Sequence, residues 1–213
     1  DSDMSVTVCQ VVALRAARNA GIRVPRATIN RALHYVITSA NDGSDPRYPA
    51  GSFLYQPETQ HFNRDSYALC AAGLTTMFQA GLYDDASLGK YIEEAGIRKR
   101  RALKIRTFID YMLKQYDLVA TPEYRRHYFF FYGNYYAAQA MYQVSGRDPA
   151  IWAKWFRRVH DDLLATQIKR PNPDPTKSEG WWVSNVDSTN AYATATALLI
   201  LQFPLDQLPI HQR

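Results

Sequence analysis

The chain has 213 residues, of which 46% are hydrophobic and 21% are charged, as in ordinary globular domains. This length suffices for one large domain or a small repeat array with a substantial core, and no apolar run reaches the roughly 18 uncharged residues that a membrane span requires. The formal charge of +5 permits an anionic partner without requiring one.

The chain begins with DSDMSVTVCQ, which lacks the pattern of a signal peptide. These residues resemble the N-terminus of a helix with no segment before it, so we expect the sequence to lack N-terminal repeats or residues. Because no leader sequence is recognised, the sequence does not assign a cellular compartment. Two cysteines, Cys9 and Cys70, are too few for a disulfide framework. Both lie in small, apolar helical segments, which favours buried free thiols; a single bridge in a secreted chain is the alternative.

Helical spacing of apolar residues recurs along the chain, whereas strand-like alternation is nearly absent. Four alanine-rich segments are apolar on almost every side, which predicts helices buried on most faces; they cover residues 4–21, 66–81, 134–146 and 190–202. Three amphipathic stripes alternate with them: Ile29, Leu33, Val36 and Ile37; Leu103, Phe108, Met112, Leu113 and Tyr116; and Trp152, Trp155, Phe156, Val159 and Leu163. The alternation predicts an all-α array in which inner helices pack against outer ones.

The ends of the inner segments indicate a repeat. Gly21, Gly81 and Gly146 each follow an inner segment, where a left-handed glycine commonly ends a helix. Their spacings of 60 and 65 residues lie within reach of the longer helical repeats. Side-chain oxygens that would cap the first amides are supplied by Asp3, Asp65, Asn134, and either Asp187 or Thr189.

Two segments carry a degenerate motif that ends in a glycine-aromatic turn. The first copy consists of Arg31-Ala32, Tyr35-Val36, Ala40, Gly51 and Phe53. The second consists of Arg158, Val159, Leu163, Gln167, Gly180 and Trp182, with Asp162 at the aromatic position and a longer gap before the glycine. This order resembles the QW motif of squalene cyclases, with Ala40 replacing the glutamine and Phe53 the tryptophan of the first copy.

With its inner segments and the ending YATATALLILQFPLDQLPIHQR, the chain is similar to the prenyltransferase and squalene oxidase repeat family. The resemblance covers essentially all of residues 1–213, as a single repeat domain. It implies an α/α toroid, in which inner helices surround a central cavity. Because the chain holds about four inner helices, we expect an arc or partial barrel unless missing residues or another subunit complete the ring.

The resemblance also implies where a catalytic acid would stand. Class II terpenoid cyclases protonate an alkene with the middle aspartate of a D-x-D-D motif. Here Asp1 and Asp3 match the first two acids, and Met4 stands at the third position. Asp3 is therefore the candidate acid of a cyclase-like protein, but we favour the interpretation that it caps a helix.

The metal chemistry of the family is not expected in this chain. The zinc-binding positions of protein prenyltransferases fall on Tyr132, Asn134 and near Asn190, none of which is a good zinc ligand. The segment DDASL, residues 84–88, lacks the final acid of a diphosphate-binding D-D-x-x-D motif. We therefore expect no metal and no cofactor, and we lean against an enzyme.

Aromatic residues crowd the start of the third inner segment, where seven of the nine residues from Tyr128 to Tyr136 are aromatic. In a toroid the upper inner ring would be lined by Tyr132, Asn134, Tyr135, Tyr136 and Tyr192, with Tyr142 as a further tyrosine. Such rings either stabilise packing between helices or line a ligand cavity. Tyrosine hydroxyls need hydrogen-bond partners, which favours packing or a protein interface.

A basic segment precedes or begins the second amphipathic helix. Its members are Arg98, Lys99, Arg100, Arg101, Lys104 and Arg106. We expect a solvated face here; attraction to phosphate or an anionic lipid is the alternative, and the lack of interleaved aromatics argues against specific nucleic-acid binding. His160, Asp161 and Asp162 are consecutive on a helix and point apart, and we expect Arg157–Asp161 and Arg158–Asp162 to be surface pairs. The proline-rich segment 169–180 is expected to be an exposed, extended loop.

These observations predict a non-catalytic repeat protein that acts as a structural, interaction or assembly subunit. Protein partners or further subunits would cover the ends of its repeat array. The alternative is an isoprenoid- or terpenoid-binding, squalene-cyclase-like protein with a central cavity, in which a hydrophobic small molecule is the ligand. The resemblance leaves an extracytoplasmic location open.

Overall fold

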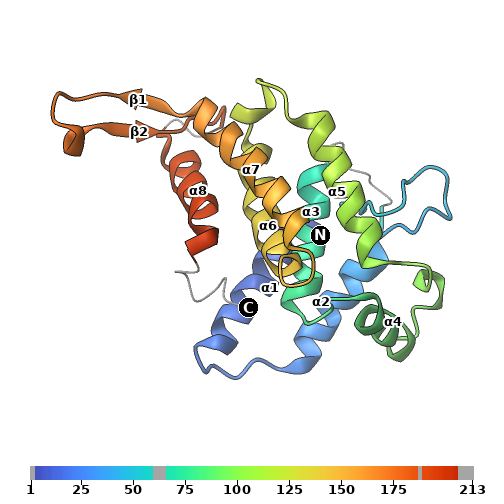
Figure 1. Ribbon diagram of the computed structural model, residues 1–213. Helices are drawn as coiled ribbons and strands as arrows, with labels where there is room; N and C mark the ends of the chain where they lie inside the picture. The colour runs from blue at the N-terminus through green and yellow to red at the C-terminus, as the bar shows by residue number, and fades with distance from the viewer. Residues whose placement is uncertain (1–2, 60–65, 187–188, 206–213) are drawn as a thin grey trace. The chain divides into compact units, whose positions relative to one another are not determined.

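The computed structural model describes residues 3–59, 66–186 and 189–205, and helices dominate it (Figure 1). The chain divides into two compact units, Asp1–Asp117 and Leu118–Arg213, which are described separately. The first contains α1 (Met4–Asn19), α2 (Arg26–Ser39), α3 (Ser66–Gln79), α4 (Asp85–Glu94) and nearly all of α5 (Ile105–Val119). The second contains α6 (Tyr128–Val144), α7 (Pro149–Thr166), the strands β1 (Ile168–Arg170) and β2 (Glu179–Trp181), and α8 (Ala191–Gln202). The prediction of a helical fold is confirmed.

Asp3 begins α1 as predicted. Its Oδ1 accepts hydrogen bonds from the Val6 amide at 2.8 Å and from Ser5 Oγ at 2.7 Å. The first amides of a helix have no partner within the helix, so this side-chain oxygen stabilises the helix start. Asp65 and Asp187, two other expected caps, lie outside the described residues. Thr189 Oγ1 accepts a bond from the Ala191 amide at 3.3 Å, at the start of α8.

The prediction that a left-handed glycine ends each inner helix is confirmed for α1 and α3 and is wrong for α6. Gly21 has a φ of 82° after α1 and Gly81 a φ of 97° after α3. Both angles lie in the left-handed region, which glycine adopts without steric penalty. Gly146 is not among the glycines with positive φ. After α6 the Asp148 amide bonds instead to the Val144 carbonyl at 2.9 Å, before α7 begins.

Helix α3 is buried on all sides, as its composition predicts. Every residue from 67 to 78 is buried, and α3 packs against both α1 and α2. Gly73 allows the Phe53 ring to approach, because a Cβ there would stand 2.5 Å from the tip of the ring. Phe53 also stacks on Phe108 of α5, with ring centroids 4.9 Å apart. The turn after α2 is thereby locked between α3 and α5.

The outer helices bury the expected stripes. The fully buried members of the three stripes are Leu33, Val36 and Ile37 in α2, Phe108, Met112 and Tyr116 in α5, and Trp155, Val159 and Leu163 in α7. In α2 the polar residues Arg26, Asn30, Arg31 and His34 are exposed. Leu103 is buried but precedes α5. The 3.6-residue period therefore identified each buried face.

Helix α4 was missed by the sequence analysis, which treated residues 84–88 only as an incomplete diphosphate motif. A capping box starts it: Asp84 Oδ1 accepts from the Ser87 amide at 2.8 Å, and Ser87 Oγ accepts from the Asp84 amide at 3.1 Å. Leu88 and Ile92 are its buried residues. A capping box followed by apolar residues four positions apart predicts a helix, so α4 could have been identified from the sequence.

Helix α6 begins earlier than predicted. Its N-cap is His127, whose Nδ1 accepts a bond from the Phe129 amide at 3.2 Å. Asn134, the expected cap, lies inside the helix, is fully buried, and donates through Nδ2 to the Phe130 carbonyl at 2.9 Å. The aromatic run hid the start of the helix, because aromatic residues are only moderate helix formers and their role here is packing.

An antiparallel pair follows the outer helix in each unit. In the first unit Ala40, which follows α2, pairs antiparallel with Phe53. In the second, β1 pairs antiparallel with β2, with Ile168 opposite Trp181. Continuing that register by one residue places Gln167 opposite Trp182. Trp182 Nε1 donates to the carbonyl of Leu163 in α7 at 2.8 Å.

Each copy of the glycine-aromatic motif ends in a buried aromatic ring. Phe53 and Trp182 are 1% and 2% exposed. The proline-rich segment between β1 and β2 is mostly exposed, and Figure 1 shows the hairpin reaching out beyond α7 and α8. The predicted extended excursion is confirmed, although the two short strands were not foreseen.

Candidate functional site

The tyrosines chosen from the sequence form a continuous row in the second unit. Ring centroids are 5.0 Å apart for Tyr192 and Tyr128, 6.0 Å for Tyr128 and Tyr132, 4.8 Å for Tyr132 and Tyr136, and 5.1 Å for Tyr136 and Tyr135. We call these five residues the tyrosine row. Tyr128 joins α8 to α6, and the sequence analysis did not select it. Tyr136 is buried and the other four are partly exposed.

The remaining candidate of that group, Asn134, does not extend the row, because its side chain is buried against its own helix. Tyr142 also stands apart from it. Its ring contacts Trp152 of α7 at 5.6 Å and Phe203 after α8 at 6.0 Å. Tyr142 therefore packs between helices, whereas most of the tyrosine row keeps part of its surface accessible.

Asp3, the candidate acid, is held as a carboxylate. Partial burial alone raises the pKa of Asp3, but hydrogen bonds from Ser5, the Val6 amide and Tyr55 outweigh it and lower the pKa below 3.8. A proton donor in a cyclase needs the opposite shift. The environment of Asp3 fits a helix cap.

The basic segment does not form one free cationic surface. Arg100 Nη2 donates to the Thr38 carbonyl at the end of α2, at 3.0 Å. Lys104 lies 4.0 Å from Asp85, and Arg106 lies 2.8 Å from Asp110. Half of the six side chains are thus engaged locally. The other three, Arg98, Lys99 and Arg101, are exposed, which fits the predicted solvated face.

One predicted surface acid is buried. Asp162 is 8% exposed, and its Oδ1 lies 2.7 Å from Arg125 Nη2, so the expected surface position of Asp162 is wrong. Arg125 belongs to a short 3₁₀ helix, Tyr124–Arg126, that packs on α7. Asp161 is exposed as expected and pairs with His160 Nδ1 at 3.1 Å. The Asp162 carboxylate anchors the segment that leads into α6.

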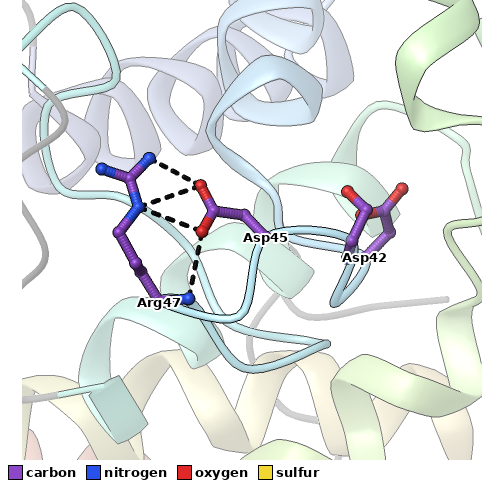
Figure 2. Close-up of polar contacts among 4 residues, drawn as sticks. Asp42, Asp45 and Arg47 are labelled. Atoms are coloured by element: carbon purple, nitrogen blue, oxygen red, sulfur yellow. Dashed lines mark hydrogen bonds and ion pairs between the residues drawn. The ribbon is translucent and has the colours of Figure 1, made fainter.

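An acidic loop follows α2. Figure 2 shows the Asp45 carboxylate facing the Arg47 guanidinium, with Asp42 farther along the loop. Arg47 Nη2 lies 2.6 Å from Asp45 Oδ2. Hydrogen bonds from the Arg47 side chain and amide lower the pKa of Asp45 to about 2. These contacts are between neighbours in the chain, so they shape the loop.

The two cysteines have opposite environments and are not disulfide-bonded. Cys70 is fully buried in α3, where its thiol donates to the carbonyls of Gly51 and Phe108 at 3.3 and 3.4 Å. Burial raises the pKa of Cys70 far above its ordinary value, so this thiol is inert at neutral pH. Cys9 is exposed. The expectation that both thiols are buried is therefore wrong for Cys9.

Helix α1 is not buried on every side, as its composition had suggested. One face is exposed in the first half of the helix, formed by Val6, Cys9, Gln10 and Ala13. Val6 is 54% exposed. These positions recur at helical spacing on one side of the helix. We call them the α1 face.

Helix α8 carries a comparable exposed surface. It consists of Ala191, Ala195 and Leu198, with Gln202 partly exposed at its end, and Leu198 is 46% exposed. We call it the α8 face. Neither face contains a charged residue, so both differ from the solvated sides of the outer helices.

The first unit also contains an open cleft of about 830 Å³. The C-terminal ends of α1 and α3, the start of α2 and one side of α4 line it. Its floor includes the buried side chains of Val11, Leu33 and Leu82, and its rim carries Arg18 and Arg26. We call it the α1–α3 cleft.

The cleft could not be predicted from a local pattern, because its residues come from four separate helices and the loops between them. No run of basic residues marks it, unlike the segment from Arg98 to Arg106. The available signal was the clustering of Arg15, Arg18, Arg23 and Arg26 around the end of α1. That signal becomes meaningful only once the adjoining ends of α3 and α4 are known.

Among the described side chains, no group of three or more His, Cys, Asp or Glu is arranged to hold a metal ion. In the same ranges, no helix combines the length and apolar character needed to cross a membrane. Comparisons with protein-family models, with curated proteins and with solved structures give no match for this chain. The functional argument therefore depends on the surfaces described above.

Proposed function

We propose that this chain is a non-catalytic repeat protein that assembles head to tail with further copies of itself, the α8 face of one copy packing on the α1 face of the next. The observation that carries the proposal is the pair of exposed, uncharged helix faces. In a repeat array, an inner helix without a charged side is stable when neighbouring helices cover it.

Packing within each unit supports this arrangement. In the first unit α1 packs against α3, and in the second α6 packs against α8, in each case through alanine-rich helices. Small side chains let such helices approach closely. A second copy would offer the α1 face another alanine-rich helix, α8, with no charge to desolvate.

The two faces differ in sequence, so their contact is heterologous. A heterologous contact leaves one face open at each end and produces a closed ring or an open filament. An isologous contact of two α1 faces would stop at a dimer. The proposal therefore predicts that both faces are needed for association.

We also propose that the two units belong to an α/α toroid of the prenyltransferase and squalene oxidase repeat type. Support comes from the order of elements that the units share, which is inner helix, outer helix, glycine-aromatic turn and inner helix. The antiparallel Ala40–Phe53 pair and the antiparallel β1–β2 pair both stand between the outer helix and the following inner helix.

The test is light scattering over a range of protein concentrations. Wild-type protein is expected to form oligomers, whereas Val6→Glu and Leu198→Glu are each expected to be monomeric with an unchanged far-UV circular dichroism spectrum. Val186→Glu is the matched control, because Val186 is 68% exposed but lies on neither face; it should associate like the wild type. A wild-type monomer at high concentration would contradict the proposal.

A second candidate function is the binding of an apolar small molecule such as an isoprenoid. The tyrosine row favours it, because four of its five rings keep accessible surface and aromatic faces attract apolar and cationic groups. The lowered pKa of Asp3 disfavours protonation of the ligand, so this candidate is a binding protein without cyclase activity.

Titration with an isoprenoid alcohol, followed by tyrosine fluorescence, tests the second candidate. Tyr128→Ala should weaken binding, since Tyr128 links the two helices of the row. Tyr48→Ala in the first unit is the control and should bind as the wild type does, because Tyr48 is partly exposed and lies in neither the row nor the cleft. Saturable binding that both variants retain would exclude the tyrosine row as the site.

A further inference from the structure

We propose that the α1–α3 cleft is a docking site for an acidic segment of a partner protein that also carries apolar side chains. This inference is independent of the proposed self-assembly. On a helical wheel, the cleft residues Val11, Arg15 and Arg18 of α1 lie on the side opposite Val6 and Ala13. Both surfaces of α1 can therefore be occupied together.

The floor of the cleft is apolar. Val11, Leu33 and Leu82 are 2%, 3% and 6% exposed and form its base, while Leu14 and Ile29 beside them are half-buried. Because the base residues have little surface left to cover, apolar side chains of a bound segment would gain free energy by removing the accessible parts of Leu14 and Ile29 from water. The floor of the cleft therefore favours a partner segment with apolar side chains.

The rim of the cleft has an excess of positive charge. Arg15, Arg18 and Arg26 line it, and within the described part of the chain none of the three forms an ion pair with a carboxylate. Arg15 Nη1 instead donates to the Gln79 carbonyl at the end of α3, at 2.8 Å, which holds it at the rim. The remaining lysine of the cleft, Lys90, already faces Glu94 at 3.8 Å.

The start of α2 adds to the positive potential. Helix α2 begins at Arg26 after Pro25, and no side chain caps it. Its first amides and the positive end of its dipole therefore stand beside the guanidinium of Arg26. Carboxylates complement this rim in charge, and arginine binds them with two parallel hydrogen bonds.

The shape of the cleft favours a chain segment over a compact ligand. A second hollow of about 340 Å³ continues it along α2 and α4, and the two share Arg26, Asn30, Tyr91 and Glu94. The extension adds Arg31 and His34 to the lining. A half-open groove with apolar floor and basic rim matches an extended or helical peptide that displays acidic and apolar residues on one side.

Fluorescence anisotropy tests this inference, with a labelled synthetic peptide in which pairs of glutamates alternate with pairs of leucines, so that each side of the extended chain carries both residue types. Three matched peptides test whether binding requires acidic and apolar side chains. They are the probe itself, a version with lysine in place of glutamate, and a version with serine in place of leucine. The probe should bind the wild-type protein, and both altered versions should bind at least about tenfold more weakly. Binding of the probe should weaken as salt is added, because the rim is exposed.

The double variant Arg18→Glu/Arg26→Glu should lose at least about tenfold in affinity for the probe. Arg98→Glu/Arg101→Glu, which makes the same charge change on exposed residues outside the cleft, should bind like the wild type. Equal weakening by both double variants would overturn the proposal, as would equal binding of the lysine peptide. Binding to vesicles of anionic lipid that depends on Arg18 and Arg26, without binding of the probe, would also overturn it in favour of a membrane surface. The Val6→Glu variant should bind the probe normally, which separates this result from the test of self-assembly.

Discussion

Gln139 occupies a position that a polar residue rarely holds without a partner. It lies on α6 and is 3% exposed. Neither its amide nitrogen nor its amide oxygen makes a hydrogen bond to any described residue. A buried amide left in this state costs about 1–3 kcal/mol, because it loses its bonds to water and gains none in return.

Gln139→Leu is therefore expected to raise the free energy of unfolding by about 1–2 kcal/mol. Leucine has a similar size and needs no hydrogen bond. Urea denaturation followed by circular dichroism measures the change. Gln143→Leu on the same helix is the control, since Gln143 is partly exposed, and it should change stability little. A loss of stability in Gln139→Leu would show that the amide has a structural partner.

The Asp45–Arg47 contact gives a prediction about pH. The pKa of Asp45 is lowered to about 2 by hydrogen bonds from Arg47. The charged form is thus favoured in the folded chain, so its contribution is present above the ordinary pKa of 3.8 and is lost as the pH falls from there toward 2. Because both side chains are exposed, the effect on global stability is small.

Nuclear magnetic resonance titration of the Asp45 carboxyl should find this low pKa in the wild type. In Arg47→Gln the pKa should move up toward 3.8, because the guanidinium is gone. Asp174, whose pKa is lowered by Thr176, should not respond to the Arg47 substitution. An ordinary pKa for Asp45 in the wild-type protein would mean that the contact in Figure 2 is not populated in solution.

At the scale of elements, the glycine-aromatic turn fixes how α2, α3 and α5 fit together. The Phe53 ring lies where a Cβ on Gly73 would be, and it stacks on Phe108. The size of residue 73 and the size of residue 53 are therefore coupled. Overpacking at such a contact typically destabilises a core by about 1–3 kcal/mol.

Gly73→Ala in the wild-type background is expected to lower the free energy of unfolding by about 1–3 kcal/mol, despite the better helix propensity of alanine. In a Phe53→Leu background the same change should cost much less, since leucine removes the ring that the new Cβ would strike. A double-mutant cycle with chemical denaturation gives the coupling energy. Additive effects of the two substitutions would contradict the described packing.

Elements with a strong local signal could be predicted from the sequence. The period of apolar residues in α2 and the Asp3 cap were sufficient to locate α2 and the start of α1. The beginning of α6 could not be placed, because Asn134 resembles a cap and the aromatic run before it has no clear helical pattern. Helix α4 was available from its capping box and was overlooked.

Properties that depend on distant residues could not be predicted. The pairing of Asp162 with Arg125 brings together positions in different elements, whereas the sequence suggested neighbours one turn away. The tyrosine row was partly anticipated, but its link through Tyr128 required the position of Tyr192 on α8. The α1–α3 cleft depends entirely on how helix ends converge.

At the scale of the whole molecule, the chain presents two kinds of surface. The α1 and α8 faces are small, mostly apolar and uncharged, which fits permanent packing between alanine-rich helices. The α1–α3 cleft has an apolar floor and an arginine rim, which fits a charged and exchangeable partner. Self-assembly and partner binding would then use different sides of α1.

The most direct test of the central claim mixes two variants that cannot associate alone. Val6→Glu disables the α1 face but keeps the α8 face, and Leu198→Glu does the reverse. Head-to-tail packing predicts that each variant is a monomer by light scattering, and that an equimolar mixture forms a dimer containing one copy of each. A mixture that stays monomeric, or a single variant that still associates as the wild type does, would contradict the account.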